Sequence, residues 1–287
     1  DIAVPYIMAY GSEEQKMKYL PGCVNGDIVT AIAMTEPGTG SDLQGIKTNA
    51  VLDGDHYILN GSKTFITNGQ MADLVIVVAR TNPEQGSKGT SLLLVDANSD
   101  GFEKGQNLEK IGMKAQDTSE LFFQDVKVPK ENVLGAEGMG FIYLMQELPQ
   151  ERLSVALNAI ASAESILEQT VEYVKDRKAF GRSISSFQNT QFKLAEMSAD
   201  ITMARVFVDK CLELLVDKNL DVVTAAKLKL ISTEMQCDVI DECLQLHGGY
   251  GYMLEYPVAR AYADARVQKI YAGTNEIMKL IIGRSLV

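Results

Sequence analysis

The hydrophobic pattern of this chain changes its period once, near Gly135–Gly140. From about Asp27 to Leu134, short runs rich in β-branched and aromatic residues alternate with turn signals. From Phe141 onward, apolar residues recur at the spacing of a helix. Because the strands and the helices fall into two separate blocks, an alternating α/β fold is excluded and the pattern predicts an α+β chain.

The first block predicts an antiparallel β-domain, built as a small barrel or sandwich. No helical pattern separates its runs, and the dipeptides Asp53-Gly54, Asn60-Gly61 and Asn68-Gly69 are typical of hairpin turns. The runs are IVTAIAMT, NAVLDGDHYIL, DLVIVVAR, TSLLLVD and ELFFQDVKVP.

The second block predicts an antiparallel helical bundle, because long helical segments are joined by short connections. These segments are 141–173, 186–216, 221–246, 256–262 and 275–286.

A helix already under way precedes the β-block. The chain opens at Asp1 rather than at Met and shows no signal or transit peptide, so we expect a fragment whose beginning is missing. The expected domains are residues 1–26, the end of an N-terminal helical domain; residues 27–138, the β-domain; and residues 139–287, the bundle.

Charge and scarce residues narrow the chemistry. The 287 residues carry a formal net charge of −11, which argues against nucleic acid or an anionic membrane as the main partner. A phosphate-bearing ligand must therefore be held by a local cluster of donors. The two histidines and four cysteines have no metal-ligand spacing, so we expect no metal site, and a Ser-His-Asp hydrolase is poorly supplied. No apolar run reaches the ~20 residues of a membrane span.

Three segments carry groups that suit such a ligand, and each has a structural alternative. Glu36–Asp42 is rich in glycine and small hydroxyl groups, but it lacks the ending of a P-loop and is also compatible with a plain turn. Gln245–Gly251 closes a helix, where glycine is expected as a cap. Arg177–Arg182 is a basic patch at a helix end, where it complements the helix dipole or grips a pyrophosphate.

One carboxylate lies on an apolar stripe. Leu144, Leu148, Glu151 and Val155 are spaced four, three and four residues apart, so they share one helix face. A carboxylate that faces a core or a cavity can act as a base near neutral pH. The alternative is that Glu151 pairs with Arg152 and only tightens the packing.

Taken together, these stretches resemble the acyl-CoA dehydrogenase family. The resemblance covers essentially the whole chain, with every motif in family order, and LPQERL is most similar to the long-chain members. The segments that carry it are Met34–Asp42, Asn60–Gly69, Arg177–Gly181 and Gln245–Lys279.

The resemblance implies a fold, a cofactor and partners. The family has an N-terminal helical domain, a β-domain and a C-terminal four-helix domain, and its members bind FAD. It also implies an acyl-CoA substrate, electron delivery to electron transfer flavoprotein, and a homotetramer or dimer. A soluble protein of the mitochondrial matrix is expected if the source is eukaryotic, and of the cytoplasm if it is bacterial.

The resemblance also assigns site residues. The loop from Ile32 to Ser41 would lie along the flavin, with hydrogen bonds from Thr35 and Ser41, and Phe65 to Thr67 would cover its ring. The adenine and pyrophosphate end would be held across a subunit boundary. The residues implied for FAD are Ile32, Met34, Thr35, Gly40, Ser41, Phe65, Ile66, Thr67, Arg177, Phe187, Gln188, Gln245, Leu246, His247, Gly248, Gly249, Thr274, Asn275 and Glu276. Those implied for the substrate are Ser41, Pro149, Gln150, Arg152, Ala272 and Gly273.

One departure decides the base. Many family members carry their catalytic Glu directly before the Gly-Thr of the last motif, where this chain has Ala272. Long-chain and isovaleryl members place it in a Glu-Arg-Leu motif, which here is Glu151 to Leu153. Glu151 is therefore reached twice, from its place on the apolar stripe and from the resemblance. Glu276 is a competing carboxylate whose family position suits FAD binding better.

The implied reaction is α,β-dehydrogenation of an acyl-CoA to a trans-2-enoyl-CoA in fatty acid β-oxidation. Glu151 would take the α-proton, and a backbone N–H near Ala272 would help to hold the thioester carbonyl. Three alternatives stay open: a short branched-chain dehydrogenase of the isovaleryl type, an acyl-CoA oxidase, and a flavoprotein scaffold without catalytic activity.

Overall fold

The computed structural model describes residues 2–287, and these form two compact units. The first unit comprises residues 2–110 and Lys114–Glu147, and the second comprises Ile111–Met113 and Leu148–Val287. Among residues 2–287, none of the helices combines the length and the apolar character that crossing a membrane requires.

The first unit opens with two helices, α1 (Ala3–Tyr10) and α2 (Glu13–Asn25), rather than with one continuous helix. The helix is interrupted because Ser12 and Gln15 form a reciprocal capping box that starts α2. Gly26 ends α2 in the left-handed conformation, with φ of 83°.

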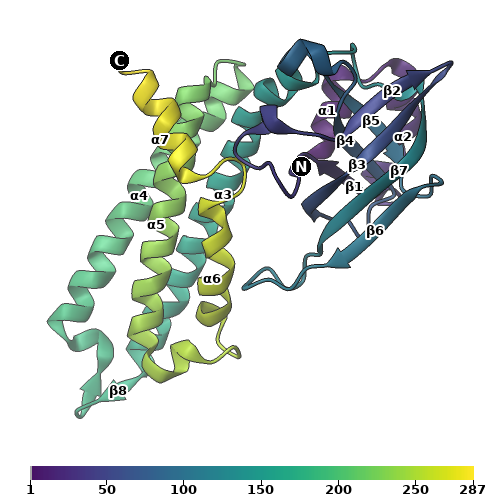
Figure 1. Ribbon diagram of the computed structural model, residues 1–287. Helices are drawn as coiled ribbons and strands as arrows, with labels where there is room; N and C mark the ends of the chain where they lie inside the picture. The colour runs from purple at the N-terminus through teal and green to yellow at the C-terminus, as the bar shows by residue number, and fades with distance from the viewer. Residues whose placement is uncertain (1) are drawn as a thin grey trace. The chain divides into compact units, whose positions relative to one another are not determined.

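A seven-stranded sheet follows, in the order β1-β4-β2-β3-β7-β6, with β5 paired to β4 (Figure 1). Its strands are β1 (Thr30–Ala33), β2 (Asn49–Asp53), β3 (His56–Thr67), β4 (Leu74–Arg80), β5 (Thr90–Asp96), β6 (Phe102–Asn107) and β7 (Thr118–Pro129).

The prediction of a purely antiparallel domain is wrong in two of these pairings. β1 pairs with β4 in parallel, and β2 meets β4 in parallel through Asn49 and Arg80. The reason lies in the connection, because the β2–β3 hairpin is inserted between β1 and β4 and brings the chain back in the same direction. β6 was not predicted, since its sequence FEKGQN lacks an apolar run.

Both faces of the sheet centre are covered. Val75, Val77, Leu93 and Leu121 belong to a core cluster on one face. Ile76 and Leu94 pack on the other face with residues of α1, such as Tyr6 and Ile7. Double coverage explains why β4 and β5 are continuous apolar runs without polar alternation.

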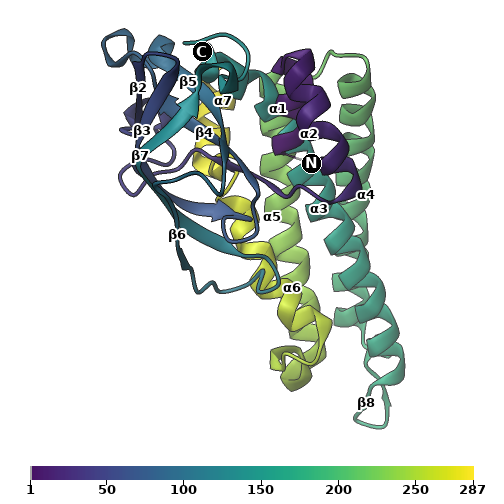
Figure 2. The ribbon, with the colours of Figure 1, turned by 90° about the vertical axis from the view of Figure 1, so that its right-hand side faces the viewer.

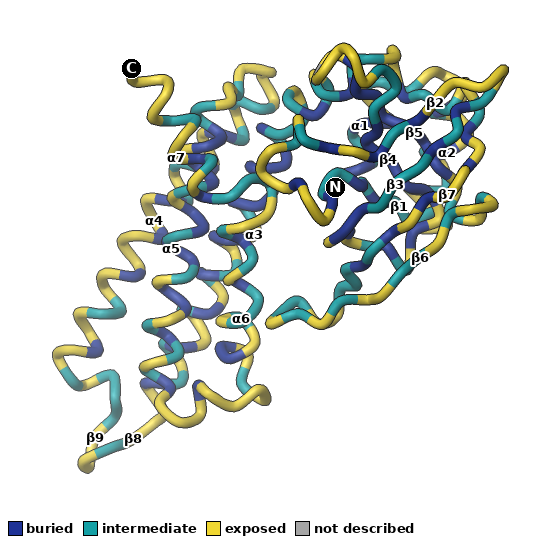
Figure 3. Tube along the Cα trace, viewed as in Figure 1, coloured by how far each residue is buried: buried dark blue, intermediate teal, exposed yellow. Residues whose placement is uncertain are grey.

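The second unit is a helical bundle, as the sequence predicts. α3, α4 and α5 lie alongside one another (Figure 2), and their inward faces are buried while the outer face of α4 is exposed (Figure 3). Asp221 caps α5 by accepting hydrogen bonds from the N–H groups of Val223 and Thr224. The elements are α3 (Gly140–Asp176), whose first two turns belong to the first unit, β8 (Lys178–Ala179), β9 (Arg182–Ser183), α4 (Gln188–Val216), α5 (Val222–His247), α6 (Pro257–Ala265) and α7 (Asn275–Arg284).

Leu121→Ala should destabilise the first unit strongly. The side chain is fully buried in the sheet core, so its truncation leaves a cavity that lowers the free energy of unfolding by about 2–5 kcal/mol. Urea unfolding followed by circular dichroism measures the change. Met71→Ala is the matched control, because 63% of Met71 is exposed and the expected change is within about 0.5 kcal/mol. Equal effects of both changes would contradict the assigned core.

Candidate active site

In the first unit, the fold brings two of the predicted flavin motifs side by side. The loop after β1 folds back on itself through a bridge between Glu36 and Thr39. The N–H of Thr64 in β3 donates to the carbonyl oxygen of Thr35 at 2.9 Å. Thr35 is half-buried, while Gly40 and Ser41 are exposed. Ile32 in β1 and Met34 just after it are half-buried.

A buried ion pair anchors this loop. Lys63, which has no exposed surface, donates to Glu36 Oε1 and to the carbonyl oxygen of Met34, both at 3.0 Å. The Glu36 carboxylate also accepts from the N–H groups of Lys47 and Thr48 at 2.6 and 2.9 Å. Burial lowers the pKa of Lys63 to about 8 although Glu36 counteracts it. Burial alone would raise the pKa of Glu36, but Lys63 and the hydrogen bonds bring it below its usual value.

The residues predicted to cover the flavin ring divide between the two faces of β3. Phe65 is 67% exposed and Thr67 is also exposed, so their side chains are free to meet a ligand. Ile66 is 3% exposed and belongs to the sheet core. Ile66 can therefore contribute only through its backbone, because neighbouring side chains of a strand point to opposite faces.

A hollow of about 490 Å³ lies next to the same loop, and sequence reasoning did not identify it. It is lined from Glu36 to Thr39, Lys47 to Asn49 and Asn60 to Ser62.

In the second unit, α3 meets the turn that contains Ala272 through the side chain of Arg152. Glu151 is 7% exposed and Arg152 is 3% exposed, both on α3. Arg152 Nε donates to the carbonyl oxygen of Ala272 at 3.3 Å. Burial lowers the pKa of Arg152, and the charge of Glu151 counteracts this shift. Pro149 lies one turn earlier inside the helix and is buried, and Gln150 is half-buried.

The turn after Tyr271 has an unusual backbone. Ala272 has φ of 52° and Gly273 has φ of 86°, so two successive residues are in the left-handed region that favours glycine. Thr274 then caps α7, because its side chain accepts from the N–H of Ile277. Asn275 is 2% exposed. Glu276 is exposed, and its own backbone N–H, followed by the Thr274 hydroxyl, holds the pKa of its carboxyl below its usual value.

Sequence reasoning missed the residue that supports this turn. Lys229 on α5 is fully buried and donates to the carbonyl oxygen of Gly273 and to Asn275 Oδ1, both at 2.9 Å. Burial, together with the nearby charge of Arg152, lowers the pKa of Lys229 to about 8. The sequence could have indicated this residue, because Lys229 shares a helix face with the small residues Ala225, Ala226 and Ser232.

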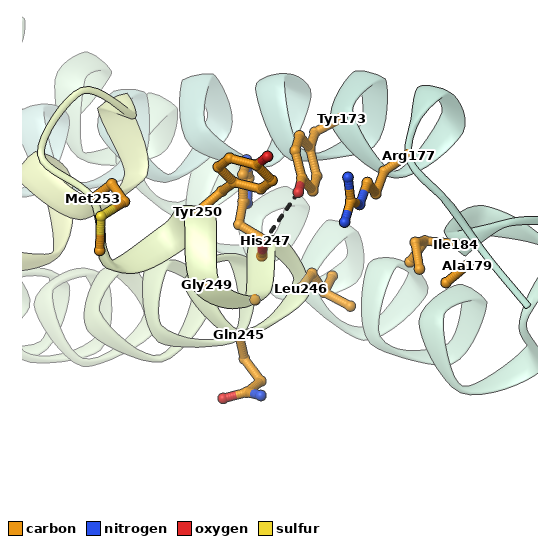
Figure 4. Close-up of a pocket in the computed structure, with 11 residues that line it drawn as sticks. Tyr173, Arg177, Ala179, Ile184, Gln245, Leu246, His247, Gly249, Tyr250 and Met253 are labelled. Atoms are coloured by element: carbon orange, nitrogen blue, oxygen red, sulfur yellow. Dashed lines mark hydrogen bonds between the residues drawn. The ribbon is translucent and has the colours of Figure 1, made fainter.

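A second site lies at the far end of α3. A hollow of about 470 Å³ is lined by Tyr173, Arg177, Ala179, Ile184, Gln245 to Tyr250 and Met253. Tyr173 and Arg177 extend towards segment 247–250, and the Tyr173 hydroxyl donates to the carbonyl oxygen of His247 at 3.2 Å (Figure 4). The ring of His247 stacks on Tyr173 at 4.1 Å, and the guanidinium of Arg177 lies 5.4 Å from the ring centre of Tyr250.

The remaining predicted residues at this end are placed differently. Gln245 is exposed and points away from Tyr173 and Arg177 (Figure 4), while Leu246 is half-buried. Phe187, which precedes α4, contacts Arg182 at 4.0 Å and Phe180. Neither Phe187 nor the exposed Gln188 lines the hollow of this chain.

The residues of this hollow fit the adenosine diphosphate part of FAD. A Cβ atom added to Gly248 or Gly249 would meet nothing within 4 Å, so their backbone is open to close approach by a ligand. Aromatic faces suit stacking with adenine, and Arg177 can bind pyrophosphate oxygens. Within residues 2–287, the His, Cys, Asp and Glu side chains form no group of three that could hold a metal ion.

The two sites of the second unit lie far apart. Glu151 and Arg177 are separated by 26 residues along α3 and the position that follows it. At about 1.5 Å per residue, the separation is about 39 Å.

Comparisons with known proteins agree with this architecture. Residues 31–126 match the middle domain of acyl-CoA dehydrogenases, and residues 138–287 match their C-terminal domain. The chain is 56% identical over 289 aligned residues to the mitochondrial long-chain specific acyl-CoA dehydrogenase of Sus scrofa, covering all of this chain and 67% of that protein. The chain therefore belongs to the acyl-CoA dehydrogenase family, whose general reaction is the FAD-dependent dehydrogenation of an acyl-CoA.

Solved structures extend the comparison to the fold. The acyl-CoA dehydrogenase of Geobacillus kaustophilus has a TM-score of 0.98 and 55% identity, with 100% of this chain and 76% of that chain covered. A glutaryl-CoA dehydrogenase from Mycobacterium smegmatis in complex with FADH2 has a TM-score of 0.95 and 32% identity, with 100% and 72% covered. The predicted fold class is thus confirmed.

Lys63 and Lys229 should titrate far below ordinary lysines. Their folded-state pKa is about 8, against 10.5 for a free side chain. Between pH 8 and 10.5 the unfolded chain binds more protons at these two positions, so their contribution to the free energy of unfolding rises with pH. Nitrogen-15 NMR of labelled lysine side chains measures both midpoints, and Lys63→Met and Lys229→Met assign the signals. Midpoints above pH 10 would contradict the burial of these ammonium groups.

Proposed function

We propose that this chain dehydrogenates a long-chain acyl-CoA to the trans-2-enoyl-CoA, with Glu151 as the base. The observation that carries the proposal is the hydrogen bond from Arg152 to the carbonyl oxygen of Ala272. Arg152 directly follows Glu151 on α3 and is bonded to the position from which many relatives supply their catalytic carboxylate, which supports Glu151 as the base. On this proposal, Glu151 supplies the carboxylate that position 272, an alanine, lacks.

Glu151 and the turn at Ala272 act on different atoms of the substrate. The Glu151 carboxylate takes the α-proton of the thioester, and its low exposure keeps water from competing for the base. The α-proton is weakly acidic, so the developing enolate oxygen needs hydrogen-bond donors. A backbone N–H at Ala272 supplies one of them, and a backbone donor is unaffected by the exchange of Glu for Ala. Pro149, Gln150 and Gly273 are assigned to substrate contacts.

FAD, when bound, accepts the β-hydrogen as a hydride. In the first unit, Thr35 and Ser41 would donate hydrogen bonds to it, and Phe65 and Thr67 would offer their exposed side chains to its ring. In the second unit, Thr274 to Glu276 are also assigned to FAD binding. The residues of the hollow at the end of α3, with Phe187 and Gln188, would hold the adenine and pyrophosphate of an FAD.

The distance along α3 supports an oligomer. The hollow and Glu151 are about 39 Å apart, which exceeds the length of an extended FAD. The two ends of α3 in one chain therefore serve different FAD molecules, so a second copy must complete each site. We propose a homodimer or homotetramer on this basis.

The relatives support a proposal for the chain length, and the family resemblance supports one for the electron acceptor. The named long-chain enzyme supports a long acyl chain and fatty acid β-oxidation in mitochondria. Electron transfer flavoprotein is the proposed acceptor.

Anaerobic titration with palmitoyl-CoA tests the reaction. We expect the visible band of the flavin in the purified protein to bleach, and Glu151→Gln to slow this reduction by about 10²–10⁴-fold because the general base is lost. Glu168→Gln is the matched control, since Glu168 is exposed on the same helix. Unchanged reduction in Glu151→Gln would refute the base assignment.

The other outcomes separate the alternatives. Bleaching by isovaleryl-CoA alone would indicate a branched-chain enzyme. Rapid reoxidation by oxygen would indicate an oxidase, and a flavin that no acyl-CoA reduces would indicate a scaffold.

Arg177→Ala should weaken FAD retention. The loss of a charge-assisted hydrogen bond worth about 1.5–3 kcal/mol raises the dissociation constant by about 10- to 100-fold. Fluorescence of released flavin after gel filtration measures it. Lys175→Ala serves as control, because Lys175 is exposed and pairs with Glu172 on the same helix. Equal flavin content in both variants would exclude Arg177 from the FAD site.

A further inference from the structure

The full burial of the Lys229 side chain is not explained by a gain in folding stability. Lys229 has no exposed surface and lies among Ala225, Ala226 and Ser232, which are also buried. Removing an ammonium group from water costs several kcal/mol, and well-packed apolar residues often stabilise such a position better. The depressed pKa of Lys229 records this cost.

The contacts of Lys229 converge on the turn beside Glu151. Its ammonium group donates to the carbonyl oxygen of Gly273 and to Asn275 Oδ1. The amide of Asn275 donates to Glu234 Oε1 at 2.8 Å and lies 3.1 Å from Thr233 Oγ1. Glu234 is in turn paired with Lys269. Lys229 is therefore the central donor of a polar network that includes both sides of Thr274.

The backbone of the turn needs this support. The left-handed conformation is strained for Ala272, so it persists only where neighbouring groups impose it. Arg152 holds the carbonyl oxygen of Ala272, and Lys229 holds that of Gly273. In a trans peptide the N–H points away from the carbonyl oxygen. These two peptide groups carry the N–H groups of Gly273 and Thr274, so holding the carbonyl groups of Ala272 and Gly273 towards the buried cations fixes the direction of both N–H groups. The N–H of Ala272 belongs to the preceding peptide, and its place is constrained through the fixed backbone of Ala272.

We propose that Lys229 is a positioning residue for the acyl-CoA reaction, which fixes the Ala272–Thr274 turn so that its backbone donor meets the thioester carbonyl. This inference rests on the proposed function, in which that donor stabilises the enolate oxygen. Lys229 acts through the turn from inside the bundle and does not touch the substrate.

The test compares Lys229→Met with Lys227→Met in the purified flavoprotein. Lys227 lies two residues earlier on α5 and is exposed. In Lys229→Met we expect kcat for palmitoyl-CoA to fall about 10- to 100-fold, as for a weakened oxyanion contact. KM should change less than kcat. Lys227→Met should behave as the unmodified protein.

Infrared spectroscopy gives a readout that a purely structural role would not move. The carbonyl stretch of bound hexadecenoyl-CoA, labelled with carbon-13 at the carbonyl, should lie below its value in water in the unmodified protein. In Lys229→Met it should return towards the value in water, while circular dichroism and flavin content stay unchanged. An unchanged carbonyl stretch and unchanged kcat in a folded Lys229→Met protein would overturn the inference.

Two milder variants keep the test decisive if Lys229→Met does not fold. Lys229→Gln retains one donor, and Asn275→Ala removes the second partner of the ammonium group. Both should give intermediate carbonyl shifts, and normal shifts in both would refute the positioning role. If the unmodified protein itself shows neither a carbonyl shift nor flavin reduction, the proposed function fails and not only the role of Lys229.

Discussion

Hydrogen bonds from buried cations to backbone carbonyl oxygens hold the loops of both units. Lys63 binds the carbonyl oxygen of Met34, Lys229 binds that of Gly273, and Arg152 binds that of Ala272. The half-buried Lys104 binds two further carbonyl oxygens, those of Gln70 and Ala72. A carbonyl group that bonds to a cation is harder to displace than one that bonds to water, because a charge-assisted hydrogen bond is roughly twice as strong as a neutral one. These hydrogen bonds fix the backbone conformation of irregular segments, as backbone hydrogen bonds do in strands and helices.

The two units use this device with different counter-charges. Lys63 meets a carboxylate directly, and Glu36 spreads its charge over the N–H groups of Lys47 and Thr48. Lys229 instead donates to a carbonyl oxygen and to the amide of Asn275, which in turn donates to the carboxylate of Glu234. The loop in the first unit is thus held by an ion pair. The turn in the second unit is held by a lysine whose link to a carboxylate runs through the hydrogen bonds of an amide.

Much of the fold could be read from the sequence, since the change of hydrophobic period reports which side chains face a core. The parallel pairing of β1 with β4 could not, because it depends on how the chain returns after the inserted hairpin. β6 could not either, since its partner β7 and not its own composition makes it a strand. For the site, the sequence motifs identified the segments that contribute. They did not show that the side chain of Ile66 points into the sheet core, while its neighbours on β3 are exposed. Lys229 stayed hidden because its place beside Ala225, Ala226 and Ser232 indicates only a face of small residues, and the sequence does not show that this face meets a turn 44 residues later.

The contact between Arg152 and Ala272 also bears on the ancestry of this chain. Residue 151 lies on a long helix and residue 272 lies in a strained turn. One hydrogen bond links these elements, because Arg152, the neighbour of residue 151, donates to the carbonyl oxygen of residue 272. If the proposed base is correct, a carboxylate could be lost from position 272 and gained at position 151 while this hydrogen bond holds the surrounding backbone in place. The catalytic group would then move between two sequence positions by side-chain exchange alone, without any rebuilding of the scaffold that serves it.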